Sequence, residues 1–326
     1  MKDDAVAPVI AVMLILAAVV TFLTVWNGIY VPSMKQSVEV GHLQNVESAF
    51  LHFSSDIERA ISARQNLTIS EPVPLGGGDF FFNTLRSSGS ISVQDERKPV
   101  YYLSLDDDDD PTTVLGEMDG TLVNISYEPV GNFWQDQGYR WQYGYLNVTK
   151  YRIKQTPLGY DTMSDVNNEL EGSGSHAIFA GSFAGADYTL NQTPLQNASP
   201  TTDNRFTFSP QTDTCSGIVI RAVNFTVSPD HPFISGNGFG TLELTSTVTS
   251  VPYYGVQKIS VGTGGEPFGN ATFRNWNSSL TTLAGACKNN IEPGDSYDGF
   301  NSFIIKQQVS PVSVTLTLVT VEVGVK

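Results

Sequence analysis

The chain has 326 residues, of which 40% are apolar and only 16% carry a charge, and its formal net charge is −15. The 18 lysines and arginines are scattered, with one adjacent pair at Arg97 and Lys98, so the sequence offers no basic cluster of the kind that binds nucleic acid phosphates. Its length and apolar content allow one or two domains with a substantial core.

The first element is an uncharged run of 22 residues, Ala5–Trp26, behind the short polar leader Met1–Asp4. A helix of this length extends roughly 33 Å, enough to cross the hydrocarbon core of a bilayer. No cluster of basic residues follows the run, and no A-x-A cleavage site closes it. The segment therefore differs from an ordinary anchor and from a secretory signal peptide.

Pro8 indicates where this helix begins. A proline in a helix interior costs about 3 kcal/mol, whereas the first four N–H groups of a helix have no partner within it. If the mature chain began at Ala5, Pro8 would be its fourth residue and would lose no hydrogen bond. This position predicts cleavage between Asp4 and Ala5, with the apolar segment retained in the mature protein.

These residues carry a family resemblance. MKDD followed by AVAPVIAVMLILAAVV resembles the class III signal peptide and apolar N-terminus of archaeal type IV pilins, whose usual form is close to D-x-A-V-S-P-V-I-G-V-x-L-M. Ala7 stands where Ser is usual and Ala11 where Gly is usual. Val9 occupies the position at which bacterial pilins carry a glutamate.

The resemblance implies a precursor that is inserted in the cytoplasmic membrane, cut by a prepilin peptidase and passed to a membrane assembly machinery. The product is expected at the archaeal cell surface as a homopolymer. Its core would be formed by the N-terminal helix, including Pro8, Val9, Ile10, Leu14, Leu16, Phe22 and Leu23. The alternative is a generic, uncleaved membrane anchor.

A second helical pattern follows the apolar run. Gly28 and Pro32 predict an interruption over Asn27–Ser33. From Met34 onward an apolar stripe recurs at spacings of three and four, formed by Leu43, Val46, Phe50, Phe53, Ile57 and Ala60. We expect the helical part, residues 5–64, to bury this stripe against the protein's own β region. Contact with neighbouring subunits is the alternative.

Beyond Arg64 we predict no further helix, because short β-prone runs separated by Gly, Pro and Asn take over. The runs are Leu67–Ile69, Gly76–Phe82, Val100–Leu105, Leu122–Tyr127, Trp141–Lys154, Ile218–Ser228, Gly240–Val251, Lys258–Val261, Phe300–Gln308 and Val312–Val323. The pattern predicts an α+β fold, in which the long hydrophobic N-terminal helix precedes a large antiparallel β-sandwich-like region over residues 65–326. One large sandwich fits this pattern, and so do two subdomains divided near residues 159–202.

Asp106–Asp110 is the densest charged cluster in the chain. In an extended segment, alternate carboxylates from Asp106, Asp108 and Asp110 point to one side and would supply oxygen ligands to calcium. The spacing of an EF-hand is absent, so a solvated acidic loop is the alternative.

An aromatic run follows at Trp141, Tyr143 and Tyr145, which we expect on one face of a single strand. If they are exposed, these rings would stack on sugars or on aromatic neighbours. If they are buried, they form a face of the core.

Cys215 and Cys287 are the only cysteines. In an exported protein an isolated pair predicts one disulfide, and two buried free thiols are the alternative. Closing a loop of this size contributes about 4 kcal/mol in the chain-entropy treatment.

Eight N-x-S/T sequons predict an exported, N-glycosylated surface. They lie at Asn66, Asn124, Asn147, Asn191, Asn197, Asn224, Asn270 and Asn277. A proline follows the sequons of Asn191 and Asn197, which makes these two the least favourable acceptors.

Catalytic patterns are missing from the sequence. It contains no H-E-x-x-H and no phosphate-binding G-x-x-x-x-G-K-[ST], and the four histidines are scattered. We therefore expect no enzyme and no cofactor beyond N-linked glycans and calcium. The expected function is a structural subunit of a type IV pilus-like extracellular filament that presents a β-rich head for adhesion or surface contact. The alternative is a monomeric, membrane-anchored surface protein, or a minor pilin-like adhesin, that binds glycans.

Overall fold

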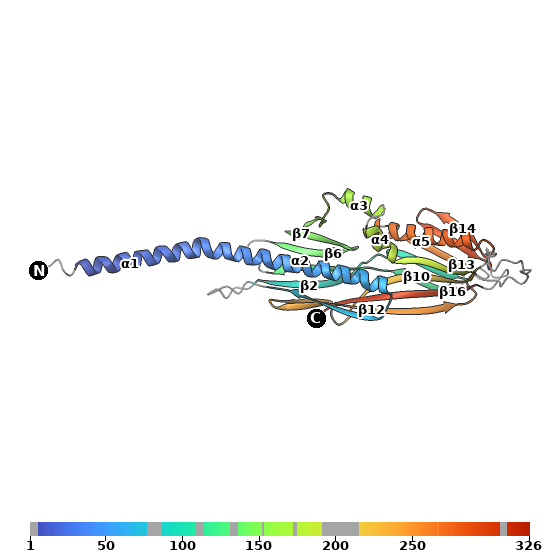
Figure 1. Ribbon diagram of the computed structural model, residues 1–326, viewed down its shortest axis with the longest axis horizontal. Helices are drawn as coiled ribbons and strands as arrows, with labels where there is room; N and C mark the ends of the chain where they lie inside the picture. The colour runs from blue at the N-terminus through green and yellow to red at the C-terminus, as the bar shows by residue number, and fades with distance from the viewer. Residues whose placement is uncertain are drawn as a thin grey trace, which may run out of the picture.

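In the computed structural model, a long N-terminal helix leads into a head of packed β-sheets (Figure 1). The structure describes residues 6–76, 87–107, 114–130, 136–151, 153–171, 175–190, 215–265, 267–306 and 312–326. The predicted α+β fold is confirmed: helix α1 (Val6–Val25) projects away from the head, and α2 (Val31–Ala63) lies along it (Figure 1).

The helix runs through Gly28 and Pro32, so the predicted interruption over Asn27–Ser33 is wrong. A single π-helical turn, η1 (Trp26–Tyr30), joins α1 to α2, and Val31 N–H donates to Trp26 O across five residues. Pro32 has no N–H to donate and lies in the first turn of α2. The wider turn absorbs the missing hydrogen bond, so the helix continues instead of breaking.

The apolar stripe on α2 is buried against the β region, as the sequence predicts. Each of its six residues is at most 3% exposed, and Val46, Ile57 and Ala60 are fully buried. The helix ends where Arg64 adopts a left-handed conformation with φ 49°, and strand β1 (Leu67–Pro74) follows directly.

Polar side chains on α2 add specific contacts beside the stripe. His42 Nε2 lies 2.9 Å from Tyr127 Oη, and Trp141 Nε1 donates to Ser54 Oγ at 2.9 Å. Tyr139 Oη donates to Glu47 Oε2 at 3.0 Å. These contacts fix the rotation of α2 about its axis, because each needs one side chain of the helix opposite one strand residue.

The described residues of the head form three sheets. The long sheet has the order β1-β12-β16-β10-β9, with β12 Phe239–Tyr253, β16 Ser313–Val325, β10 Cys215–Val227 and β9 Ala184–Leu190. The proximal sheet, nearer α1, has the order β11-β2-β5-β6-β7-β8, with β11 Phe233–Gly236, β2 Ser88–Asp95, β5 Val123–Val130, β6 Gln137–Gln142, β7 Tyr145–Lys150 and β8 Ile153–Pro157. The distal sheet has the order β14-β15-β13-β3-β4, with β14 Ile291–Tyr297, β15 Phe300–Ile305, β13 Lys258–Thr263, β3 Tyr101–Asp106 and β4 Val114–Gly120.

The long sheet connects the two ends of the head. Its long strands β10, β12 and β16 run past α2 and the proximal sheet toward the distal sheet (Figure 1). Almost every strand pair is antiparallel, but β10 and β16 are parallel over Gly217–Val227 and Ser313–Val323. A parallel pair requires a long connection between its strands, and the β11, β12, α5 and distal-sheet segments supply it.

A helix that the sequence patterns did not predict packs between the long and distal sheets. α5 (Pro267–Ala286) buries Phe268, Trp276 and Leu280. Trp276 Nε1 donates to Arg221 O at 3.2 Å, and its ring lies edge-on to Tyr101 with centroids 4.7 Å apart. Two shorter helices, α3 (Met163–Glu171) and α4 (Ser175–Ser182), join the proximal sheet to β9 and were also missed.

The expectation that Trp141, Tyr143 and Tyr145 share one strand face is wrong. Tyr143 and Gly144 have φ of 56° and 82° and form a tight turn between β6 and β7. The turn gives each ring a separate environment: Tyr143 stacks on Phe268 at 5.7 Å, and Tyr145 packs on Tyr160 at 5.5 Å. Trp141 and Tyr145 are buried, as in the core alternative.

Most other predicted strands are present with shifted ends. The predicted run Trp141–Lys154 is divided among β6, β7 and β8. Strands β2, β4, β9, β11 and β14 were not predicted, and the run Gly76–Phe82 lies almost wholly outside the described residues.

Candidate functional site

The most distinctive surface is the bare apolar helix α1. It contains no charged residue, and Val9, Leu14 and Phe22 are 55%, 66% and 63% exposed. The other residues predicted for a filament core, Pro8, Ile10, Leu16 and Leu23, are also exposed. A helix that is apolar on all sides needs an apolar environment, because water solvates none of its faces well.

The dimensions of α1 suit a bilayer. Its 20 residues extend about 30 Å, and by length and composition it can cross a membrane. The hydroxyls of Thr21 and Thr24 donate to Ala17 O and Val20 O at 2.7 and 2.8 Å, so both are satisfied within the helix. Pro8 lies in the first turn of α1, where a missing N–H removes no helical hydrogen bond.

A column of aromatic rings begins at the C-terminal end of α1, where the helix approaches the head. Phe22 stacks on Trp26 with centroids 6.0 Å apart, and Trp26 stacks on Tyr30 at 5.7 Å. The π turn carries this column out of the apolar segment toward the head. Trp and Tyr are typical of the boundary between hydrocarbon and water, so the column lies where the apolar environment of α1 would end.

The eight sequon asparagines occupy different environments. Asn66 and Asn270 are exposed, and Asn224 and Asn277 are half-buried. The side-chain oxygens of all four accept hydrogen bonds, from Val248, Thr263, Thr121 and Asn301 respectively. Asn124 and Asn147 are only 7% and 2% exposed, which corrects the prediction for these two: a glycan on either amide has no room in the folded head. Asn191 and Asn197, like the predicted cleavage pair Asp4 and Ala5, lie outside the described residues.

Cys215 and Cys287 form a disulfide with Cα atoms 5.4 Å apart. Cys215 begins β10, Cys287 directly follows α5, and both are fully buried. Asn290 Oδ1 accepts from Cys215 N at 2.9 Å, and Asn290 N donates to Cys287 O at 2.8 Å. The disulfide therefore ties the end of α5 to the long sheet, and the hydrogen bonds of Asn290 to both cysteines reinforce this link.

Only part of the predicted calcium site lies within the described residues. The hydroxyl of Ser104 donates to Asp106 Oδ1, and Gln257 Nε2 donates to Asp107 Oδ1 at 3.0 Å. Asp108 and Asp110 lie outside the described residues, and within the described part no three acidic, histidine or cysteine side chains are grouped as metal ligands. Calcium binding by the acidic cluster stays a prediction.

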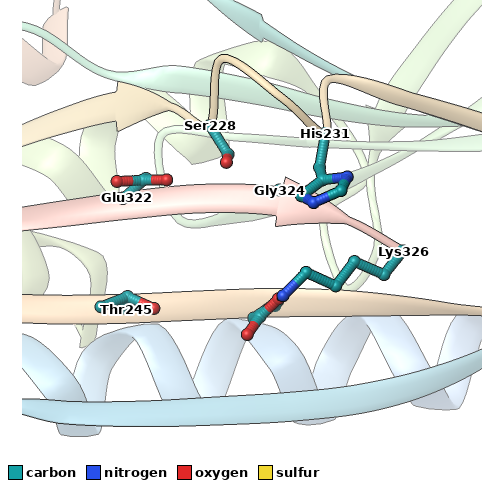
Figure 2. Close-up of a pocket in the computed structure, with 7 residues that line it drawn as sticks. Ser228, His231, Thr245, Glu322, Gly324 and Lys326 are labelled. Atoms are coloured by element: carbon teal, nitrogen blue, oxygen red, sulfur yellow. The ribbon is translucent and has the colours of Figure 1, made fainter.

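A small pocket of about 100 Å³ lies where β16 and β12 meet the turn after β10, and Figure 2 shows its side chains. Ser228, His231 and Glu322 approach it, and Lys326 forms an ion pair with Glu243. The described side chains of Ser228 and His231 share no hydrogen bond; instead His231 N donates to Ser228 O at 3.3 Å within a turn. These contacts stabilise the C-terminal end of β16, and they do not align a nucleophile with a base.

Comparison with known proteins finds no matching family, no matching curated protein and no matching solved structure. Function must therefore be inferred from the exposed helix and the head themselves.

Proposed function

We propose that this protein is the structural subunit of an archaeal type IV pilus-like extracellular filament. One observation carries the proposal: a single continuous helix has one half locked into the head by buried contacts and the other half apolar and bare. Such a rod transmits force between head and core, because no flexible linker separates the two halves.

The bare half suits two successive environments. Lipid tails and packed apolar side chains solvate it similarly, so α1 can leave a bilayer for a bundle of identical helices at little cost in free energy. Ala7, Ala11, Ala17 and Ala18 would allow close approach of neighbouring helices. The resemblance of residues 1–20 to archaeal pilins gives the direction of this transfer, from membrane precursor to filament.

The head would face the surroundings. Its acidic composition, low lysine and arginine content, and exposed sequons at Asn66 and Asn270 suit a hydrated, glycosylated outer layer. The partners expected are further copies of the same chain, a prepilin peptidase and a membrane assembly machinery. Adhesion or surface contact through the head would be the biological role.

The test uses one charge in α1 and a matched charge in α2. Leu16→Lys places an ammonium group in the filament core, whereas Leu51→Lys places one on the exposed face of α2, where Leu51 is already 46% exposed. In archaeal cells that assemble type IV pili, we expect sheared filaments from wild type and Leu51→Lys but none from Leu16→Lys. Imaging of the filaments at side-chain resolution should place residues 9–26 in the core.

Wild-type protein that remains in the membrane fraction with its Met1–Asp4 leader intact, and is missing from sheared filaments, would contradict the proposal. That outcome would support the anchored monomeric surface protein instead. A filament whose core lacks residues 9–26 would contradict it as well.

A further inference from the structure

The face of the proximal sheet that points away from α2 is polar and hollowed. Side chains alternate between the faces of a strand, and Tyr127, Tyr139 and Trp141 contact α2. Their neighbours Ser126 and Arg140 therefore point to the opposite face, where a groove of about 430 Å³ opens. We name it the polar groove, and its lining includes Ser90, Ser92, Ser126, Arg140, Thr149 and Lys154.

One row of directly paired residues crosses the groove from β11 to β7. Phe233 pairs with Ser92, Ser92 with Ser126, Ser126 with Arg140, and Arg140 with Asn147. Side chains of directly paired residues share a sheet face, so the row presents an aromatic ring, two hydroxyls and a guanidinium in sequence. The distance from Phe233 to Arg140 is three strand spacings, or about 14 Å, which accommodates two sugar rings.

Gly138 forms part of the floor of the groove. A Cβ atom at this position would lie 2.4 Å from Tyr127 O and 2.7 Å from Thr149 Oγ1, so no larger residue fits without a shift of the backbone. The absence of a side chain here leaves the hollow open beside Thr149.

Polar atoms on this face are buried without a partner. Asn147 and Asn124, which are 2% and 7% exposed, have unpaired Oδ1 atoms, and the Nε of Arg140 is also buried and unpaired among the described residues. Burying an unpaired polar group costs free energy, so each of these sites calls for a partner. Of these three residues only Arg140 lines the groove, so a ligand there would meet its guanidinium and not the asparagine oxygens.

The charges in the groove sum to zero, so they disfavour a polyanion, and a single carboxylate would pair with Arg140 and Lys154. Arg140 and Lys154 contribute two positive charges, and Glu128 and Asp136 contribute two negative ones. Lys154 Nζ donates to Gln142 Oε1 at 2.8 Å, and Gln142 Nε2 donates to Glu96 Oε1 at 2.7 Å, so this end of the groove is already ordered. Burial, and then the neighbouring Arg140, lower the pKa of Lys154, whereas Glu96 opposes that change.

The geometry points to an oligosaccharide site, and we propose that the polar groove binds a glycan containing a uronic acid. One sugar ring would stack on Phe233, which is 59% exposed. Sugar hydroxyls would bond to Ser92 and Ser126, and the uronic carboxylate would lie at Arg140 and Lys154. This binding resides in the head alone, so it does not depend on the proposed assembly through α1.

The test measures binding of a disaccharide of one galacturonic acid and one galactose to the full chain in detergent micelles by calorimetry. The uncharged methyl ester of the same disaccharide serves as the matched ligand. We expect the acid to bind about tenfold more tightly than the ester, the scale of one charge-assisted hydrogen bond. Arg140→Gln should remove that difference, and Phe233→Ala should weaken both ligands.

Tyr254→Ala is the control variant, because Tyr254 is 78% exposed and does not line the groove, and it should bind like wild type. Phe233 is exposed as well, so its replacement tests the site even if Arg140→Gln fails to fold. Equal binding of acid and ester would overturn the carboxylate assignment. Lack of binding by either sugar at a concentration on the order of 10 mM, or binding unaffected by Phe233→Ala, would overturn the site.

Discussion

Single residues on α2 decide how the helix and head hold together. Phe53 is 1% exposed and lies in the stripe that enters the core, whereas Leu51, two residues earlier, is 46% exposed on the opposite side of the helix. The pair offers a buried position and an exposed one within a single turn.

Phe53→Ala should lower the free energy of unfolding by about 3–5 kcal/mol, because it removes apolar contacts and leaves a cavity. Leu51→Ala should change it by less than about 0.5 kcal/mol, as is usual for surface substitutions. Urea unfolding of the full chain in detergent micelles measures both. Equal effects at the two positions would show that the stripe is not packed as described.

His42 links stability to pH. Burial lowers the pKa of its imidazole below the ordinary value of about 6.5, and its Nε2 contacts Tyr127 Oη. The unfolded chain therefore binds a proton more readily, and stability falls as the pH drops from about 6.5 through the lower pKa of the folded state.

His42→Gln should reduce the loss of stability between about pH 7.5 and pH 5.5, because it removes the imidazole that is buried in its neutral form. Thermal unfolding at the two pH values measures the effect. An identical pH dependence in wild type and His42→Gln would contradict the assignment.

At the scale of elements, periodicity in the sequence predicts the long helix and most of the long strands. The stripe of α2 was recognisable because large apolar residues recur on a polar background. The strand that became β16 alternates from Val312 to Leu318, and the residues on its apolar side are buried or nearly so. These patterns succeed where one face of an element is apolar and the other is polar.

α5 shows where such reasoning failed. Phe268, Thr272, Trp276 and Leu280 recur every four residues, and Pro267 opens the helix, so the signal was present in the sequence. Asn, Ser, Thr and Gly between these positions are poor helix formers and concealed it. The long and distal sheets cover the helix on its apolar side, and this tertiary contact outweighs the weak propensity.

The π turn and the polar groove were beyond sequence reasoning for a different reason. The turn depends on how Pro32 is accommodated by residues before it, which local propensity does not specify. The groove depends on register: Ser92, Ser126 and Arg140 come from three strands and form a row only because of how those strands are paired. The exposed apolar helix, by contrast, followed directly from the sequence.

The disulfide ties the end of α5 to β10, so its contribution to stability tests how these two elements are joined. Reduction should lower the free energy of unfolding by about 4 kcal/mol, according to the chain-entropy treatment of a 72-residue separation. A melting curve with and without reductant measures the loss. The double variant Cys215→Ser, Cys287→Ser should be insensitive to reductant, and a wild-type curve that is also insensitive would contradict a bonded pair.

For the whole molecule, the bare helix and the head should be separable. The main contacts of α1 are with the adjoining η1 turn, and no described side chain of α1 or η1 is buried. Removing residues 1–30 therefore takes no buried side chain from the head. We expect the shortened protein to be soluble without detergent, to unfold as cooperatively as the full chain and to form no filaments. Aggregation of the shortened protein, or loss of its β-sheet circular dichroism signal, would contradict this separation.

The central place of β16 in the long sheet sets the order of folding. It follows every other described strand along the chain, yet it lies between β12 and β10, and β12 in turn holds β1. The long sheet therefore stays incomplete until Ser313–Val325 has been synthesised, and its contacts join segments that are distant in sequence, which makes folding slow. A nascent chain would keep exposed strand edges during this interval, so aggregation would compete with folding until β16 has paired with β12 and β10.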